Sequence, residues 1–318
     1  MTYIQRAYST AASPATVAGL SERAQRFQEL DGMVPSFSDL EVELATEDRA
    51  FWCYLKPQIR PSFTASMLND LHAMQHWIVD TLGPQPGADA PIQWFVLASR
   101  TPGVFNLGGD LTLFSQEIRA GNRENLRRYA HSCVESGYLN YSGYNGGIVT
   151  IGLAEGDAFG GGWECLMSCD VLVAEKRARF ALPESLFNMF PGMGASSYLT
   201  RRLGVVQAER VIMSGNVYTA EEMHALGAVD LVVENGTGVE AVRQYIQRSA
   251  TRHNMHSAVY KARRRAAPVT IEELHDIADI WVEAAFRLKE QDLRRMSHIA
   301  AAQDRQRRRT AVPAVAAE

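Results

Sequence analysis

Two glycine-rich segments, each placed between an apolar strand-like run and a helix-like run, restrict most strongly what this chain can fold into. They are residues 105–110 (FNLGGD) and 158–164 (AFGGGWE). Glycine lets the main chain approach a ligand closely, and the start of a helix offers unpaired N–H groups backed by the helix dipole. Two such loops facing each other could hold one carbonyl oxygen between two N–H donors. Either loop alone is a weak signal, because glycine turns are common.

Strand-like and helix-like patterns alternate on both sides of these loops. Residues 41–56 alternate polar and apolar side chains, as in strands with one buried face, and residues 66–82 place apolar side chains at helical spacing. Further apolar runs of strand length lie at 93–98, 147–154, 171–174 and 229–233, and helices are expected at 111–138, 163–169, 207–213 and 220–226. This alternation predicts an α/β layered fold.

The two ends of the chain differ from this central region. Residues 1–37 read as a lead-in with one helical stretch at 20–30, and residues 38–238 as the α/β core. Residues 239–318 carry helical patterns, with an apolar stripe made up of Ile277, Ile280, Trp281, Ala284, Ala285 and Leu288. Because no linker rich in proline, glycine or serine precedes it, we expect this helical region to pack on the core or on a neighbouring subunit.

Composition argues against several classes of function. The 318 residues carry a formal net charge of −4, which provides no overall basic field for nucleic acid or anionic lipid. No stretch approaches the roughly 18 to 20 apolar residues of a membrane span. The four cysteines form no C-x-x-C pair, so a reducing compartment is expected and no metal site. Cys165 and Cys169 are four residues apart, but buried apolar cysteines are favoured over a metal pair.

Two glutamates lie in apolar surroundings, which is unusual for a charged residue. Glu164 follows Gly-Gly-Trp, and Glu184 follows Phe-Ala-Leu-Pro. Burial would raise their pKa values into the range useful for proton transfer at neutral pH. The plain alternative for either one is a solvated surface charge. No G-x-S-x-G elbow, P-loop or dinucleotide fingerprint is present, so serine-hydrolase and nucleotide-dependent chemistries are not favoured.

The combination of motifs resembles the crotonase (enoyl-CoA hydratase/isomerase) superfamily. The matching segments are NLGGD at 106–110, GGGWE at 160–164, LPE at 182–184 and FPGMGA at 190–195. The resemblance implies a crotonase (ClpP/crotonase-like) spiral of ββα units followed by a helical C-terminal region. It also implies an oxyanion hole made by the backbone N–H groups of Leu107 and Gly161, and acid/base catalysis by Glu164 and Glu184. The substrate-binding residues expected beside them are Gly108, Gly109, Gly160 and Trp281.

Within the superfamily, the chain is most similar to the bacterial diffusible signal factor synthases, on residues 104–111, 156–164, 181–195 and 280–285. The resemblance implies a cytoplasmic dehydratase and thioesterase. Such an enzyme converts 3-hydroxyacyl-ACP to cis-2-enoyl-ACP and releases a free cis-2-unsaturated fatty acid as a quorum-sensing signal. Hydratases often place a lysine just before the first glycine loop, near the CoA phosphates. This chain has Pro102-Gly103-Val104 there, which favours the carrier-protein enzyme over a CoA-dependent one. The alternatives are a CoA-dependent enoyl-CoA hydratase or isomerase, and a non-catalytic binding protein of the same fold.

The resemblance also bears on cofactors and partners. It implies that no cofactor is needed beyond the thioester carrier, and that the chain forms a homo-oligomer (trimer or dimer of trimers). The implied partners are acyl carrier protein, a fatty acyl substrate and a possible regulatory sensor protein. Two basic clusters are candidate landing patches for an acidic carrier protein; they are residues 261–265 and Arg119, Arg123, Arg127 and Arg128. A solvated helix face is the plainer interpretation of both.

Overall fold

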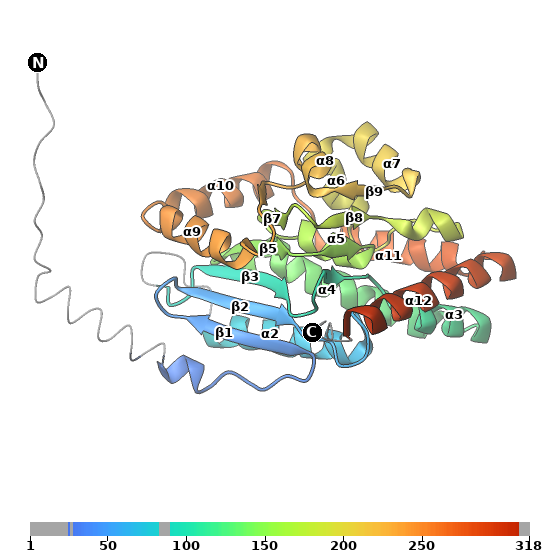
Figure 1. Cartoon of the computed structure of the whole chain (residues 1–318), viewed down its shortest axis with the longest axis horizontal. Helices are drawn as coiled ribbons and strands as arrows, with labels where there is room; N and C mark the ends of the chain where they lie inside the picture. The colour runs from blue at the N-terminus through green and yellow to red at the C-terminus, as the bar shows by residue number, and fades with distance from the viewer. Residues whose placement is uncertain (1–24, 26–27, 83–89, 312–318) are drawn as a thin grey trace, which may run out of the picture. The chain divides into compact units, whose positions relative to one another are not determined.

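The computed structural model describes residues 25, 28–82 and 90–311. The chain divides into two compact units, residues 1–35 and residues 36–318. In the first unit, residues 28–31 are helical and overlap the helix predicted at 20–30, most of which lies outside the described residues. The elements labelled in Figure 1 all belong to the second unit, so the fold of the candidate site is contained there.

A six-stranded sheet runs through the second unit in the order β1-β2-β3-β5-β7-β10. The strands are β1 (Leu40–Ala45), β2 (Ala50–Leu55), β3 (Trp94–Ser99), β5 (Val149–Ala154), β7 (Val171–Glu175) and β10 (Leu231–Val233). The β1–β2 pair is antiparallel and the other pairs are parallel. Parallel neighbours require helical crossovers, which explains the alternation of patterns along the chain. The predicted α/β class is confirmed.

Helices pack on both faces of this sheet, and further helices pack on those. The helices are α2 (Ala65–Leu82), α3 (Leu111–Ala120), α4 (Arg123–Gly146), α5 (Gly161–Met167), α6 (Ala195–Leu203), α7 (Val205–Ser214), α8 (Ala220–Leu226), α9 (Gly238–Ala250), α10 (His253–Ala266), α11 (Ile271–Ala285) and α12 (Glu290–Ala311), with a 3-10 helix η1 (Pro183–Phe187). Successive residues of β3 reach opposite faces: Phe95 contacts Tyr144 of α4, and Trp94 contacts His253 of α10. Among the described residues, every helix is too short or too polar to cross a bilayer.

A smaller sheet of order β4-β6-β8-β9 positions the candidate site. Its strands are β4 (Val104–Asn106), β6 (Asp157–Phe159), β8 (Arg179–Ala181) and β9 (Val217–Thr219). Because β4, β6 and β8 are parallel, their carboxyl ends leave one edge of the sheet. The first glycine loop, the second glycine loop and the LPE segment start at these three ends. None of these four strands was predicted, since runs of three residues show no readable alternation.

The single helix predicted at 111–138 is in fact two helices. Gly121, in the left-handed region at φ 72°, ends α3, and α4 begins two residues later. The start of α3 is capped by Asp110, whose side chain accepts two backbone N–H groups of the first turn. Apolar residues continue at helical spacing from α3 into α4. Gly121 was therefore the one sign of the break in the sequence, and glycines are frequent in this chain.

The C-terminal helices pack on the α/β core (Figure 1). Val242 and Ile246 of α9 join the core cluster on one face of the large sheet. Helix α11 lies along α4, and α12 contacts α3 and η1. The predicted stripe on α11 was partly wrong, because Ile280 is 58% exposed. The residues of α11 that are buried are Leu274, Ala278, Trp281, Val282 and Ala285.

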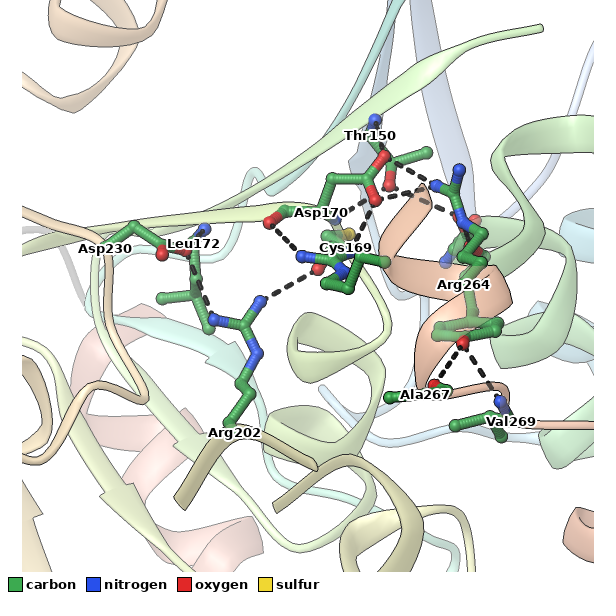
Figure 2. Close-up of polar contacts among 12 residues, drawn as sticks. Thr150, Cys169, Asp170, Leu172, Arg202, Asp230, Arg264, Ala267 and Val269 are labelled. Atoms are coloured by element: carbon green, nitrogen blue, oxygen red, sulfur yellow. Dashed lines mark hydrogen bonds and ion pairs between the residues drawn. The ribbon is translucent and has the colours of Figure 1, made fainter. Parts of the chain in front are cut away.

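Asp170 ties α10 to the core (Figure 2). Its buried carboxylate accepts hydrogen bonds from Arg263 and Arg264, each at 2.7 Å, and from the Thr150 backbone N–H at 3.1 Å. Burial raises the pKa of Asp170, and the two guanidinium groups oppose that rise. Two arginines of the basic cluster at 261–265 therefore neutralise an internal carboxylate.

Replacing Asp170 by asparagine is expected to lower the free energy of unfolding by about 3 kcal/mol, because the two guanidinium groups then face a neutral amide. Urea denaturation measures the change. The control is Glu290→Gln, which removes the exposed ion pair with Arg119 and should shift the midpoint little. Equal stability of the two variants would show that the Asp170 network contributes nothing net.

Candidate active site

The two glycine loops touch each other through backbone. In the first loop, the Asn106 side chain accepts the Gly108 N–H at 2.7 Å, and Gly108 takes a φ of 96°. A Cβ on Gly108 would lie 2.9 Å from the carbonyl oxygen of Phe159 and 3.0 Å from the nitrogen of Gly161. Any side chain at Gly108 would therefore push the loops apart.

The second loop brings the start of α5 against both the first loop and Glu184. Gly160 has a φ of 50°, and a Cβ built on it would lie 2.5 Å from a carboxylate oxygen of Glu184. A Cβ on Gly162 would lie 2.2 Å from the carbonyl oxygen of Asn106. Close approach on two sides thus explains why this loop contains successive glycines.

The prediction that the Leu107 N–H forms the oxyanion hole is not met in this structure. This N–H donates to the carbonyl oxygen of Pro61 at 2.6 Å, because the segment before α2 runs alongside the first loop. The Gly108 N–H is also occupied, as described above. Among the described residues, the N–H groups of Gly109 and Gly161 have no partner, and a Cβ on Gly161 would lie 3.5 Å from the Gly109 nitrogen. The neighbouring free donors are therefore those of Gly109 and Gly161.

Glu164 lies in the first turn of α5 and is 1% exposed. One of its carboxylate oxygens accepts the backbone N–H groups of Met193 at 2.8 Å and Ala195 at 2.9 Å. Burial raises the pKa of Glu164 to about 7, and the two N–H donors oppose the rise. These two donors favour the ionised form of Glu164.

Glu184 lies in η1, directly after β8. Its Oε2 atom is buried and accepts no hydrogen bond from the described residues. Burial, and after it the nearby charge of Glu164, raise the pKa of Glu184 to about 8, although a hydrogen bond from its own backbone opposes the rise. When the two carboxyls share one proton, the hydrogen bonds favour Glu164 as the ionised member and Glu184 as the protonated one.

One cavity is bordered by both carboxyls and by the N–H-bearing glycines. Its wall consists of Leu107, Gly109, Leu111, Phe114, Gly161, Glu164, Pro183, Glu184, Phe187, Gly192, Met193, Trp281 and Gln303. Trp281, which was expected to contact substrate, is buried with its ring 5.0 Å from that of Phe114. A Cβ on Gly192 would lie 2.3 Å from the indole, so glycine there makes room for Trp281. The wall of this cavity therefore combines apolar side chains with two carboxyls.

Several residues of this wall were not identified from the sequence. Met193 belongs to the FPGMGA motif, which was the available signal; its sulfur would lie 3.1 Å from a Cβ on Gly161. Met193 and Gly161 also border a second cavity, whose other lining residues are Phe63, Leu68, Cys133, Ser136, Gly137 and Cys165. Gln303 reaches the site from α12, 196 residues away in sequence, and donates to the Leu107 carbonyl oxygen at 3.1 Å. No local pattern could have indicated that contact.

Cys165 and Cys169 are free thiols on and just after α5. Burial raises the pKa of Cys165 to about 12 and raises that of Cys169 well above its usual value. Both cysteines therefore stay protonated at neutral pH and behave as small apolar groups, rather than as the thiolates that bind metals.

Two arginines in each of the basic clusters noted in the sequence have acidic partners. Arg127 pairs with Asp279 at 2.7 Å, and Arg119 pairs with Glu290 at 3.1 Å. The cluster at 261–265 contributes two arginines to the Asp170 network described above. Much of the positive charge in both clusters is thus neutralised within the chain, which weakens the prediction that they receive an acidic carrier protein.

Comparisons with known proteins agree with this geometry. The family model for enoyl-CoA hydratase/isomerase matches residues 87–300. The mitochondrial enoyl-CoA hydratase of Pongo abelii is 33% identical over 117 residues, which cover 37% of this chain and only 40% of that protein. A probable enoyl-CoA hydratase of Mycobacterium leprae is 28% identical over 206 residues, covering 62% of this chain and 72% of that protein. The crystal structure of an enoyl-CoA hydratase from Bacillus halodurans has a TM-score of 0.68 at 20% identity, covering 82% of this chain and 100% of that chain. The predicted crotonase fold is thereby confirmed.

Proposed function

Because this chain belongs to the enoyl-CoA hydratase/isomerase family, we propose that it catalyses the reversible addition of water to a 2-enoyl thioester. The observation that carries the proposal is that Glu164 and Glu184 border one cavity together with Gly161. Burial raises the pKa of both carboxyls toward neutrality. One acid and one base can therefore coexist there near pH 7, as addition of water across a double bond requires.

The hydrogen bonds support a division of roles between the glutamates. In hydration, Glu164 is the base: two N–H donors favour its ionised form, and it takes a proton from the attacking water. Glu184 is the acid, which delivers its proton to the carbon next to the thioester carbonyl. Dehydration of a 3-hydroxyacyl thioester starts from the opposite protonation state, with the roles exchanged.

Negative charge develops on the thioester oxygen in either direction, so the proposal requires N–H donors beside the carboxyls. Gly161, at the start of α5, supplies the first donor, and Gly109 supplies the second. Both N–H groups are free among the described residues, whereas that of Leu107 would first have to leave the Pro61 carbonyl. Met193 borders the same cavity beside Gly161.

Hydration is expected to show a bell-shaped pH dependence with its optimum between the two pKa values. The rate falls when Glu164 becomes protonated below its pKa of about 7, and it falls again when Glu184 loses its proton above about 8. A profile of kcat/KM from about pH 5.5 to about 9.5 checks this. The residual activity of Glu184→Gln should lack the alkaline limb. A flat wild-type profile would contradict the two-carboxyl mechanism.

Two carriers of the acyl group remain in the proposal. The family match supports coenzyme A. One observation favours acyl carrier protein instead: the segment before the first loop reads Pro102-Gly103, and the preceding cation, Arg100, pairs with Glu41 at 2.8 Å and stacks on Tyr54. With that carrier, the chain would act as the signal synthases do, dehydrating 3-hydroxyacyl-ACP to the cis-2-enoyl form and hydrolysing the thioester.

Supplying the same 3-hydroxyacyl and 2-enoyl chains on each carrier, followed by mass spectrometry, tests the proposal. Interconversion of the two CoA thioesters without free acid is the result expected of a hydratase. Release of free cis-2-enoic acid from the carrier protein would support the synthase function instead. The double variant Glu164→Gln/Glu184→Gln measures the background. No turnover above that background on either carrier would contradict both functions.

A further inference from the structure

A cluster of metal-ligating side chains lies between α4 and α11, and none of its members lines the cavity of the candidate active site. His131, Glu135 and His275 each offer one ligand atom, and these atoms lie within 4.8 Å of one another. The two imidazole rings stack with their centroids 4.2 Å apart and their planes 7° from parallel. His131 Nε2 lies 2.8 Å from an Asp279 carboxylate oxygen, and His275 Nε2 lies 3.2 Å from one of Glu135.

The register of two antiparallel helices builds this cluster. His131 and Glu135 are four residues apart on α4, and His275 and Asp279 are four residues apart on α11, so each pair shares one helix face. His131 contacts Asp279, and His275 contacts Glu135. Antiparallel helices produce this crossed order of contacts. Each helix therefore contributes one imidazole and one carboxylate to the same place.

We propose that this cluster is a binding site for a divalent transition metal such as Zn²⁺, with His131, Glu135 and His275 as ligands. Two imidazoles and a carboxylate suit such an ion, whereas Mg²⁺ and Ca²⁺ prefer oxygen ligands alone. Ligand atoms around a tetrahedral Zn²⁺ lie roughly 3.4 Å apart, so separations of up to 4.8 Å must shorten by up to about 1.4 Å. The stacked rings must also tilt so that their nitrogens converge on one ion. The three side chains are between 19% and 48% exposed, which leaves solvent-filled space on one side for these movements. Asp279 orients His131, in the manner of a carboxylate behind a metal-bound imidazole.

The charges around the cluster fit a cation. Glu135 and Asp279 bring two negative charges, and Arg127 offsets one of them through hydrogen bonds of 2.7 and 3.0 Å to Asp279. Glu135, Asp279 and Arg127 together carry a net formal charge of −1. A surface hollow bordered by His131 and Glu135, and also by Arg127 and Arg128, gives an ion access.

A bound ion would cross-link α4 to α11 from outside the active site. Helix α11 carries Trp281 in the cavity wall, and α4 carries Cys133 in the wall of the second cavity. The ion would stabilise the packing of these two helices and would not contact an acyl substrate. Its effect should therefore be measurable as binding and as thermal stability, whatever reaction the enzyme catalyses.

Calorimetric titration of the metal-stripped, tag-free whole chain with zinc sulfate tests this site. We expect one ion per chain and a rise in the thermal midpoint on binding. His131→Ala and His275→Ala should each weaken binding at least tenfold. Asp279→Asn should weaken it by about tenfold to a hundredfold, because His131 loses its orienting carboxylate. The matched control is His298→Ala, which removes an exposed imidazole of α12 outside the cluster and should keep wild-type affinity.

Co²⁺ provides a second readout, since a tetrahedral cobalt site absorbs visible light and His275→Ala should abolish that absorption. Circular dichroism establishes that each variant is folded. Where a histidine variant does not fold, the near-isosteric Glu135→Gln takes its place, with the same expected loss of affinity. Failure of the wild-type chain to bind zinc, or equal affinity of the cluster variants and His298→Ala, would overturn the proposal.

Discussion

Replacing Glu164 by glutamine is expected to lower kcat for hydration of a 2-enoyl thioester by about 10²- to 10⁴-fold. The amide cannot take a proton from water, although its oxygen can still accept the N–H groups of Met193 and Ala195. Because those two hydrogen bonds are kept, the fold should be preserved and the loss should fall on kcat rather than on KM. Initial rates followed through the absorbance of the enoyl thioester measure the effect.

Glu184→Gln should cause a loss in the same range, since it removes the proton donor. The two carboxyls act as a unit, so the double variant should be little worse than either single variant. Glu155→Gln is the matched control: burial also raises the pKa of this half-buried glutamate, but it lies outside the cavity. Near-normal rates in both single variants would remove these carboxyls from the mechanism.

Replacing Gly161 by proline is expected to lower kcat/KM by about 10²- to 10³-fold, the usual effect of losing one oxyanion-hole donor. Gly161 is the first residue of α5, and proline is tolerated at that position of a helix because its nitrogen has no intrahelical partner there. The substitution therefore removes the N–H while leaving the helix intact. Turnover of the same enoyl thioester at saturating and limiting concentrations measures the loss.

Gly161→Ala separates the loss of the N–H from the addition of a Cβ. Alanine and proline both add a Cβ, which would lie 3.1 Å from the sulfur of Met193. Alanine, however, keeps the N–H. We expect Gly161→Ala to retain most of the activity that Gly161→Pro loses. Equal losses in the two variants would show that steric contact with Met193, rather than a missing donor, is responsible, and Gly161 would no longer be assigned to the oxyanion hole.

Patterns between nearby residues account for most of the secondary structure. The strand predicted at 93–98 and the helix predicted at 220–226 correspond to β3 and α8, because apolar periodicity reports which face of an element is buried. The exposed Ile280 shows where this reasoning fails. Which side of an apolar helix is covered depends on its neighbours, and α11 turns toward α4 along a different stripe.

Local patterns establish the alternation of strands and helices, the glycine loops and the two glutamates in apolar surroundings, since each is a property of residues close together in the chain. Tertiary contacts fix which backbone donors remain free and which distant residues line the cavity. The Leu107 N–H is taken by Pro61, and Gln303 arrives from the last helix. Such contacts join distant segments, and their formation depends on how elements pack, about which the local pattern of residues carries no information.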